Sequence, residues 1–275
     1  MIKRVINKIK RVVKEDIIKK EVIVTNIPTY QNTLLENKVA IIFGGTGEIG
    51  KAIVEEFINS GAKVIVSGRN LQKLEDTKKQ YDVEIVQLDL NEFDKYDLKI
   101  AEAFKIYGTI DICVICSGVQ TEKDKQLLFF DINEEDYDKD LDTNLKSVFF
   151  ICQKISKYMI DNKIKGHIVN VCSERGFRAA SVPYDISRWG QRGLIQGLGM
   201  MLAEYQIVVN GIAPGMVSTE MAGYTPDSSL YLKSHPNFRY ALPKEIANTC
   251  VFLASDLGNN IIGETIVSDG GSHLA

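Results

Sequence analysis

An apolar run that ends in a glycine-dense turn constrains this chain more than any other stretch of its sequence. The run Val39–Phe43 predicts a strand, residues 44–50 (GGTGEIG) a tight turn, and residues 51–58 a helix, because their apolar positions recur at helical spacing. Glycines let the backbone approach a pyrophosphate, which then faces the free amides at the helix N-terminus. This order is typical of a mononucleotide-binding unit, although a tight turn can need glycine without a ligand.

Strands and helices alternate along the rest of the chain. Strands are expected at 63–67, 83–88, 110–115, 167–172, 207–211 and 264–267, and helical segments at 71–81, 96–106, 134–160, 182–205 and 244–254. The alternation predicts an α/β fold of Rossmann type, a doubly wound parallel sheet with helices on both faces. Residues 33–275 are expected to form it as a single domain.

Composition excludes several classes of protein. The net charge is −3 and the basic residues are spread through the body of the chain, so we expect no nucleic-acid partner. The apolar runs are too short to span a bilayer. Five cysteines, an odd number, fit free thiols in a reducing cytoplasm, which is the expected location. Cys113 and Cys116 form a CxxC inside an apolar run, where small buried side chains are a better interpretation than a metal site.

Residues 1–32 form an extension that differs from the body of the chain. Residues 1–20 carry eight Lys or Arg, and their apolar residues recur at three- and four-residue spacing, which predicts a basic amphipathic helix. Packing on the body or on a neighbouring subunit is the favoured interpretation. Contact with an anionic membrane surface is the alternative.

Further motifs follow the glycine turn in a fixed order. They are LDL at 88–90, SG at 117–118, TNL at 143–145, GHIVNVCS at 166–173, PYDISRWG at 183–190, NGIAPG at 210–215 and SDGG at 268–271. Together they resemble the motifs of the short-chain dehydrogenase/reductase family over residues 34–271. The resemblance implies an NAD(P)-dependent oxidoreductase that interconverts a carbonyl and an alcohol on a small molecule, with a sugar or polyol derivative as one candidate.

The resemblance assigns catalysis to Ser173, Tyr184, Arg188 and Asn144. Tyr184 and Arg188 are four residues apart on one expected helix and share a face, and a neighbouring cation favours the phenolate form of a tyrosine. Ser173 follows a strand, at the edge of the sheet where open α/β folds bind ligands. These side chains can hold a carbonyl oxygen and protonate it while hydride arrives from the cofactor. Asn144 would position a water that restores the proton. Taken singly, each residue also has an ordinary structural interpretation.

Cofactor binding is assigned by the same resemblance to residues in the turns after the strands and in the catalytic helix. They are Gly44, Thr46, Gly47, Glu48, Ile49, Gly50, Arg69, Asp89, Leu90, Ser117, Gly118, Tyr184, Arg188, Pro214, Gly215, Val217 and Thr219. NAD enzymes place an acid at the end of the second strand, whereas an arginine there suits a 2′-phosphate. Here Gly68 takes the place of the acid and Arg69 follows it, so NADP(H) is the expected cofactor and NAD(H) the alternative.

Two departures from the family pattern leave other functions open. Arg188 replaces the family's lysine, and arginine keeps the charge but cannot release a proton. Glu48 stands where the main branch has its middle glycine, and the spacing of Gly44, Gly47 and Gly50 is that of the extended branch. The alternatives are a sugar-nucleotide epimerase or dehydratase with bound NAD(P), and a catalytically impaired cofactor-binding sensor or scaffold.

The helix after Tyr184 and the irregular stretch 221–240 carry the remaining predictions. The helix is apolar on more than one face, so we expect a homodimer or homotetramer; the residues are Leu194, Ile195, Leu198, Met200, Met201 and Leu202. In the resembling family this helix packs against its copy. The stretch 221–240 is expected to cover the substrate.

Overall fold

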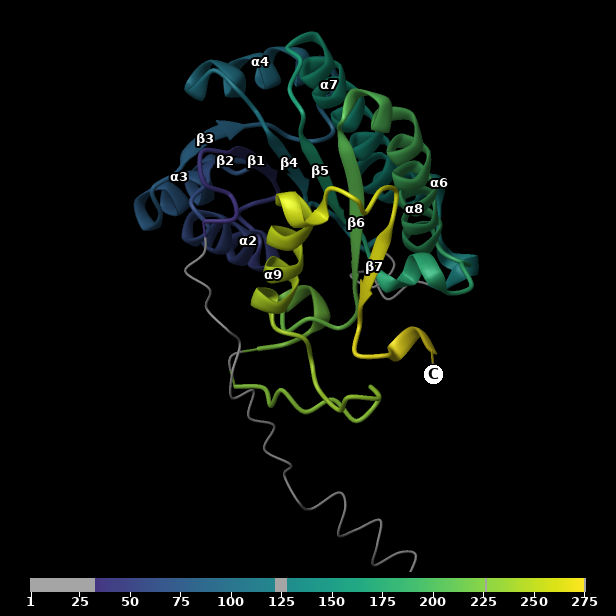
Figure 1. The fold of residues 1–275 in the computed structure, drawn as a ribbon. Coiled ribbons are helices and arrows are strands. Elements are labelled where there is room, and N and C mark those ends of the chain that lie inside the picture. The colour runs from purple at the N-terminus through teal and green to yellow at the C-terminus, as the bar shows by residue number, and fades with distance from the viewer. Residues whose placement is uncertain (1–32, 122–127, 226, 275) are drawn as a thin grey trace, which may run out of the picture.

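A sheet of seven parallel strands organises the part of the chain that the structure describes (Figure 1). The computed structural model describes residues 33–121, 128–225 and 227–274. The strand order is β3-β2-β1-β4-β5-β6-β7, with β1 at Val39–Phe43, β2 at Lys63–Gly68, β3 at Glu84–Gln87, β4 at Ile112–Ile115, β5 at His167–Val171, β6 at Val208–Pro214 and β7 at Thr265–Ser268. Every neighbouring pair is parallel, so all carboxyl ends meet at one edge. The predicted Rossmann-type sheet is confirmed.

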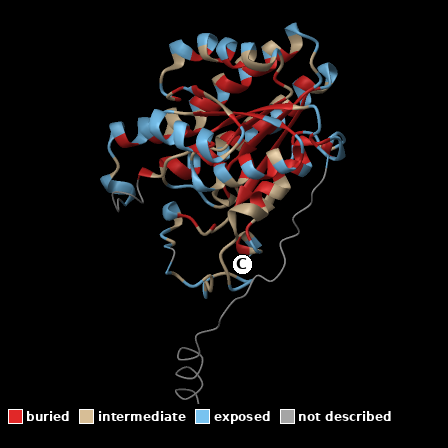
Figure 2. Cartoon of the chain, turned by 90° about the vertical axis from the view of Figure 1, so that its left-hand side faces the viewer, coloured by how far each residue is buried: buried red, intermediate tan, exposed pale blue. Residues whose placement is uncertain are grey.

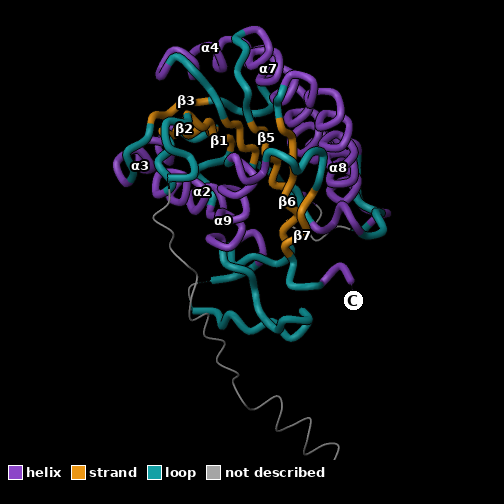
Figure 3. Tube along the Cα trace, viewed as in Figure 1, coloured by secondary structure: helices purple, strands orange, loops and turns teal. Residues whose placement is uncertain are grey.

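Helices cover both faces of this sheet (Figure 3). One face carries α2 (Glu48–Asn59), α3 (Leu71–Gln80) and α9 (Pro243–Ala254), and the other carries α4 (Tyr96–Tyr107), α7 (Ser147–Asp161) and α8 (Pro183–Leu202). A shorter helix, α6 (Glu134–Leu141), lies beside α8. Each face has its own apolar core, with Phe57 and Ile246 in one and Tyr96 and Ile151 in the other.

The central strands are buried on both sides (Figure 2). All residues of β1, β4 and β5 are buried, which explains why β1 and β4 are continuous apolar runs instead of alternating patterns. Cys113 is buried in β4, where burial raises the pKa of its thiol well above the usual value. All five cysteines are free. The interpretation as small core residues is confirmed for Cys113, whereas Cys116 lies just after β4 and is only partly buried.

The helical region predicted over 134–160 is confirmed, and one of its turns is not α-helical. A π-helical turn, Asp142–Lys146, separates α6 from α7. Inside it, the backbone carbonyl of Asn144 accepts a hydrogen bond from Gln191 of α8 (2.5 Å). A carbonyl that bonds to another helix widens the local turn, and such bulges recur at functional sites.

Three further predictions concern the ends of elements and of the chain. Strand β6 runs to Pro214, beyond its predicted end, because β7 pairs with it as far as Ser268. The amphipathic helix predicted for residues 1–20 lies outside the described residues. Within the described ranges, no helix has the length and hydropathy that crossing a membrane requires.

Candidate active site

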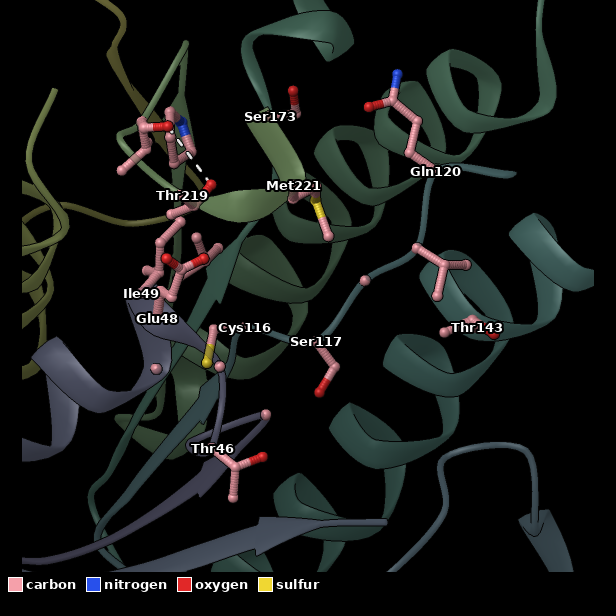
Figure 4. A pocket seen from close by; sticks show the side chains of 18 of the residues that line it. Thr46, Glu48, Ile49, Cys116, Ser117, Gln120, Thr143, Ser173, Thr219 and Met221 are labelled. Atoms are coloured by element: carbon pink, nitrogen blue, oxygen red, sulfur yellow. Dashed lines mark hydrogen bonds between the residues drawn. The ribbon is translucent and has the colours of Figure 1, made fainter. Parts of the chain in front are cut away.

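A cavity of about 900 Å³ opens at the carboxyl edge of the sheet. It lies across the ends of β1 and β4, which are neighbours in space but not in sequence, and open α/β sheets bind ligands at such switch points. Figure 4 shows side chains of the glycine turn (Thr46, Glu48, Ile49), of the turn after β4 (Ser117) and Ser173 after β5 around the same space. Every predicted site residue except Asn144 lines this cavity.

The glycine turn forms a tight cradle in which Gly44 and Gly50 have no room for a side chain. Gly44 adopts φ +81°, and a Cβ on Gly50 would lie 2.1 Å from the carbonyl oxygen of Gly44. Helix α2 therefore begins directly against the turn. Its N-cap, Gly47, provides no side-chain cap, so the amides of the first turn are available to a pyrophosphate.

Glu48 lies at the edge of this cradle and binds a distant segment of the chain. Its carboxylate accepts a hydrogen bond from the backbone N–H of Glu220 (2.8 Å), 172 residues away in sequence. The carboxylate is thus held by the 3₁₀ helix Glu220–Ala222 and does not cap α2. This contact ties the glycine turn to the segment that follows β6. That segment contributes Pro214, Gly215, Val217 and Thr219 to the cavity wall.

Basic residues gather at the end of β2. Arg69 follows the strand and lines the cavity together with Lys73, which lies in the first turn of α3. Asn70 caps α3 by accepting a hydrogen bond from the Lys73 amide (3.0 Å). Asp89, after β3, lines the same end of the cavity with Leu90. Two cations and a helix N-terminus suit a phosphate.

Three of the four catalytic candidates have side chains at the cavity, and they come from two places in the fold. Ser173 follows β5, and Tyr184 and Arg188 lie in the first two turns of α8; Tyr184 is 7% exposed and Arg188 is 4% exposed. The Ser173 hydroxyl oxygen accepts a hydrogen bond from the Arg175 amide (3.2 Å). That bond uses a lone pair, so the serine proton remains free to be donated to a bound oxygen.

Arg188 is fixed by contacts on three sides. Its guanidinium carbon lies 4.6 Å from the centre of the Tyr184 ring, within cation–π range. Its Nη1 donates to the side-chain oxygen of Gln191 (3.0 Å). A Cβ on Gly118 would lie 2.4 Å from its Nη2, so only glycine leaves room for it there. The charge is thus held over the ring whose phenolate it would stabilise.

Asn144 lies behind the cavity wall. It is fully buried, and its side chain forms two hydrogen bonds with the backbone of Val119 (both 2.9 Å). Gln191 links it to Arg188, because one Gln191 amide accepts from the guanidinium and donates to the Asn144 carbonyl. The structure thus joins three buried residues in one chain of hydrogen bonds.

Sequence reasoning missed three residues of the site. Lys73 and Arg175 line the cavity, and Gln191 supports Arg188 from behind. Lys73 could have been found, since it stands one turn into the helix after Arg69. Gln191 and Arg175 carried no motif, because their roles depend on how α8 packs. In the stretch 221–240, Met221 and Ala222 line the cavity, whereas Arg239 forms a bidentate ion pair with Glu245 (2.6 and 2.7 Å).

The residues present fit a nicotinamide dinucleotide. The glycine cradle and the first-turn amides of α2 would hold its pyrophosphate, Arg69 and Lys73 would face the adenosine ribose, and Tyr184 and Arg188 would lie at the nicotinamide end. Bound there, the cofactor supplies or accepts hydride. Fold and site together define an oxidoreductase of the Rossmann class.

Comparisons with known proteins agree with that class. A family model described as enoyl-(acyl carrier protein) reductase matches residues 45–273. A 3-oxoacyl-(acyl-carrier-protein) reductase of Chlamydia muridarum is 32% identical, over 87% of this chain and 99% of the relative. An acetoacetyl-CoA reductase of an Acinetobacter strain is 30% identical, over 87% and 99%. The crystal structure of a candidate gluconate dehydrogenase of Agrobacterium tumefaciens superposes with a TM-score of 0.80 at 26% identity, over 89% and 99%.

The chain belongs to the short-chain dehydrogenase/reductase family. It is therefore an NAD(P)-dependent oxidoreductase that acts on CH–OH groups and carbonyls, as the motifs predicted.

Proposed function

We propose that this enzyme is an NADP(H)-preferring ketoreductase for a small-molecule substrate, with Tyr184 as the acid that protonates the carbonyl oxygen. The observation that carries the proposal is the convergence of Ser173, Tyr184 and Arg188 on the cavity that also holds the glycine cradle. A sugar or polyol derivative is one substrate candidate, which the likeness to a candidate gluconate dehydrogenase supports. A 3-oxoacyl compound is the other, which the reductase relatives support.

In the proposed reaction, Ser173, Tyr184 and Arg188 have different roles. The Ser173 hydroxyl and the Tyr184 phenol donate hydrogen bonds to the substrate oxygen and hold the carbonyl in one orientation. As negative charge develops on that oxygen, Tyr184 gives it a proton. The guanidinium over the ring stabilises the resulting phenolate, and it stays charged because arginine does not deprotonate. The proton must return to Tyr184 by a route other than Arg188, such as solvent in the open cavity.

The preference for NADP(H) rests on Arg69 and Lys73. No acidic side chain follows β2 directly, since the strand ends at Gly68 and is followed by Arg69 and Asn70. Two cations there favour a 2′-phosphate over free ribose hydroxyls.

Reduction of a ketone panel with both cofactors tests the function. The panel should contain open-chain sugars, dihydroxyacetone and 3-oxoacyl esters, and NADPH oxidation is followed at 340 nm. We expect Tyr184→Phe to lose activity by about 10²–10⁴-fold, the usual contribution of a general acid. Tyr205→Phe, on the exposed end of the same helical region, is the matched control. Equal turnover by both variants would remove Tyr184 from the mechanism.

The same panel separates the two alternative functions. An epimerase would retain its bound cofactor and show no net consumption of NADPH. The structure argues against an epimerase, because after Arg188 the described chain forms only the remaining helices and strands of the one sheet, without a separate sugar-nucleotide domain. A sensor would bind NADPH in calorimetry and reduce no member of the panel. Recovery of activity in Arg188→Lys would then show that the arginine is the obstacle.

The proposal extends to assembly and location. The surface of α6, α7 and α8 exposes large apolar side chains: Tyr137, Phe149, Ile186, Trp189, Met200 and Met201, with Met200 81% exposed. A homodimer or homotetramer in the cytoplasm would cover them. Light scattering at micromolar concentration tests this, and a monomer would contradict it. The extension 1–32 is proposed to pack within that assembly, and co-sedimentation with anionic vesicles would favour the membrane alternative.

A further inference from the structure

Arg175 is a second arginine at the catalytic end of the cavity, and the mechanism does not use it. It stands two residues after Ser173 in the 3₁₀ helix Glu174–Phe177 and lines the cavity. Its backbone amide is held by the Ser173 hydroxyl oxygen. Its hydrogen bond to Asp185 is the main cause that raises the pKa of its guanidinium above the usual value. Asp185, which binds this guanidinium, directly follows the proposed proton donor, Tyr184, on α8.

Asp185 fixes the plane of this guanidinium. The Nε and Nη2 of Arg175 donate to the two carboxylate oxygens of Asp185, at 2.7 and 2.6 Å. The side chain of Asp185 is 1% exposed, whereas that of Arg175 is 39% exposed. Because the buried carboxylate follows Tyr184 directly on α8, its partner is held in register with the catalytic helix.

One edge of the guanidinium remains free. An arginine has five N–H donors in a planar fork, and Asp185 takes the pair on the Nε side. The Nη1 and Nη2 protons on the opposite edge have no partner among residues 33–121, 128–225 and 227–274. That edge has the spacing of two oxygens of a carboxylate or a phosphoryl group.

We propose that the free edge of Arg175 binds an oxyanion on the substrate, so that the enzyme selects ketones carrying a carboxylate or a phosphoryl group. The inference rests on the proposed function and adds a substrate class to it. A guanidinium placed in advance loses little freedom on binding, which favours affinity for the charged group. Arg188 adds a second positive charge to the same end of the cavity, where its guanidinium contacts Gln191 and the Tyr184 ring.

Matched pairs of ketones test the proposal on the full chain. The pairs are acetoacetate with ethyl acetoacetate for the carboxylate, and dihydroxyacetone phosphate with dihydroxyacetone for the phosphoryl group. Both kcat/KM with NADPH and calorimetric Kd on the enzyme–NADP⁺ complex are measured. For at least one pair, we expect kcat/KM and affinity to be about 10- to 100-fold higher for the charged ketone than for the neutral one. This factor corresponds to one charged hydrogen-bonded contact.

Variants then assign the preference to Arg175. Arg175→Gln alone would leave the buried Asp185 carboxylate without its partner and could unfold the protein. The double variant Arg175→Gln/Asp185→Asn avoids this, because it replaces the ion pair with a neutral pair. We expect this double variant to lose the preference, mainly through KM, while the neutral ketones stay within about threefold. Arg175→Lys should keep part of the preference, since it retains charge but not the fork. Arg192→Gln is the control, because Arg192 stacks on Phe177 and Trp189 outside the cavity lining.

The outcomes separate this inference from the proposed function. Reduction of neutral ketones through Tyr184 without a preference for either charged partner would overturn the inference alone. An equal loss on charged and neutral ketones in the double variant would also overturn it, because that pattern indicates a structural role. Arg175-dependent binding of an anionic ketone without any turnover would support the inference and remove the proposed function. Failure of both anionic probes to bind the wild-type complex would overturn the inference.

Discussion

Gln191→Leu removes the link between two of the buried catalytic candidates, Asn144 and Arg188. Gln191 is fully buried, accepts a hydrogen bond from Arg188 Nη1 at 3.0 Å and donates one to the Asn144 carbonyl at 2.5 Å. Leucine has a similar volume but no polar atoms, so a charged donor and a backbone acceptor are left buried without a partner. Each such group costs about 1–3 kcal/mol, more for the charged one. The Nε of Arg188 already lacks a hydrogen-bond partner in the described structure, which leaves it few alternatives.

We therefore expect Gln191→Leu to lower the free energy of unfolding by about 2–5 kcal/mol. Urea unfolding followed by far-UV circular dichroism measures this, at one fixed protein concentration because the proposed assembly would contribute to stability. In the protein that folds, kcat should fall by up to about 10²-fold, since Arg188 is no longer held over the Tyr184 ring.

The matched control is Gln196→Leu, an exposed glutamine on the same helix. It should change stability by less than about 0.5 kcal/mol and leave kcat unaltered. If Gln191→Leu behaved like Gln196→Leu in both measurements, the hydrogen-bonded bridge would have no energetic or catalytic weight. If stability fell but kcat did not, Gln191 would be a structural residue only.

Three further predictions concern the cofactor, a glycine and a histidine. Arg69→Gln/Lys73→Gln should reduce the preference for NADP(H) over NAD(H) in kcat/KM by about 10- to 100-fold. Lys79→Gln, on the same helix as Lys73 but outside the cavity lining, should leave this preference unchanged. An unchanged preference in the double variant would contradict the assignment of Arg69 and Lys73 to the 2′-phosphate. Gly118→Ala should lower kcat at least about tenfold, because its Cβ would displace the Arg188 guanidinium, while Gly193→Ala, with open space around it, should leave kcat intact. Burial lowers the pKa of His167 below that of an unfolded histidine, so the unfolded state takes up the proton first as pH falls, and stability should decline below about pH 6.5. Urea titrations between pH 5 and 7 should show a flatter profile for His167→Gln, and identical profiles would contradict this reasoning.

The sequence by itself determined the fold and the outline of the site. Apolar runs of strand length, separated by helical periodicities, leave a parallel sheet as the arrangement that buries them. Because parallel strands end at one edge, residues that follow the strands converge there, which is why Gly44, Arg69, Ser117, Ser173 and Thr219 line one cavity although 175 positions separate the first from the last.

The tertiary structure decided how the side chains are used. Glu48 binds the Glu220 amide, a contact between segments far apart in the chain. The π-helical turn at Asn144 bonds to Gln191 of another helix, so local periodicity over 134–160 could not reveal it. Asp185 aims Arg175 only because α8 packs against the turn after β5. Local spacing encodes which face a residue takes on its own element, but a hydrogen bond between elements depends on their packing, which no single stretch of sequence contains.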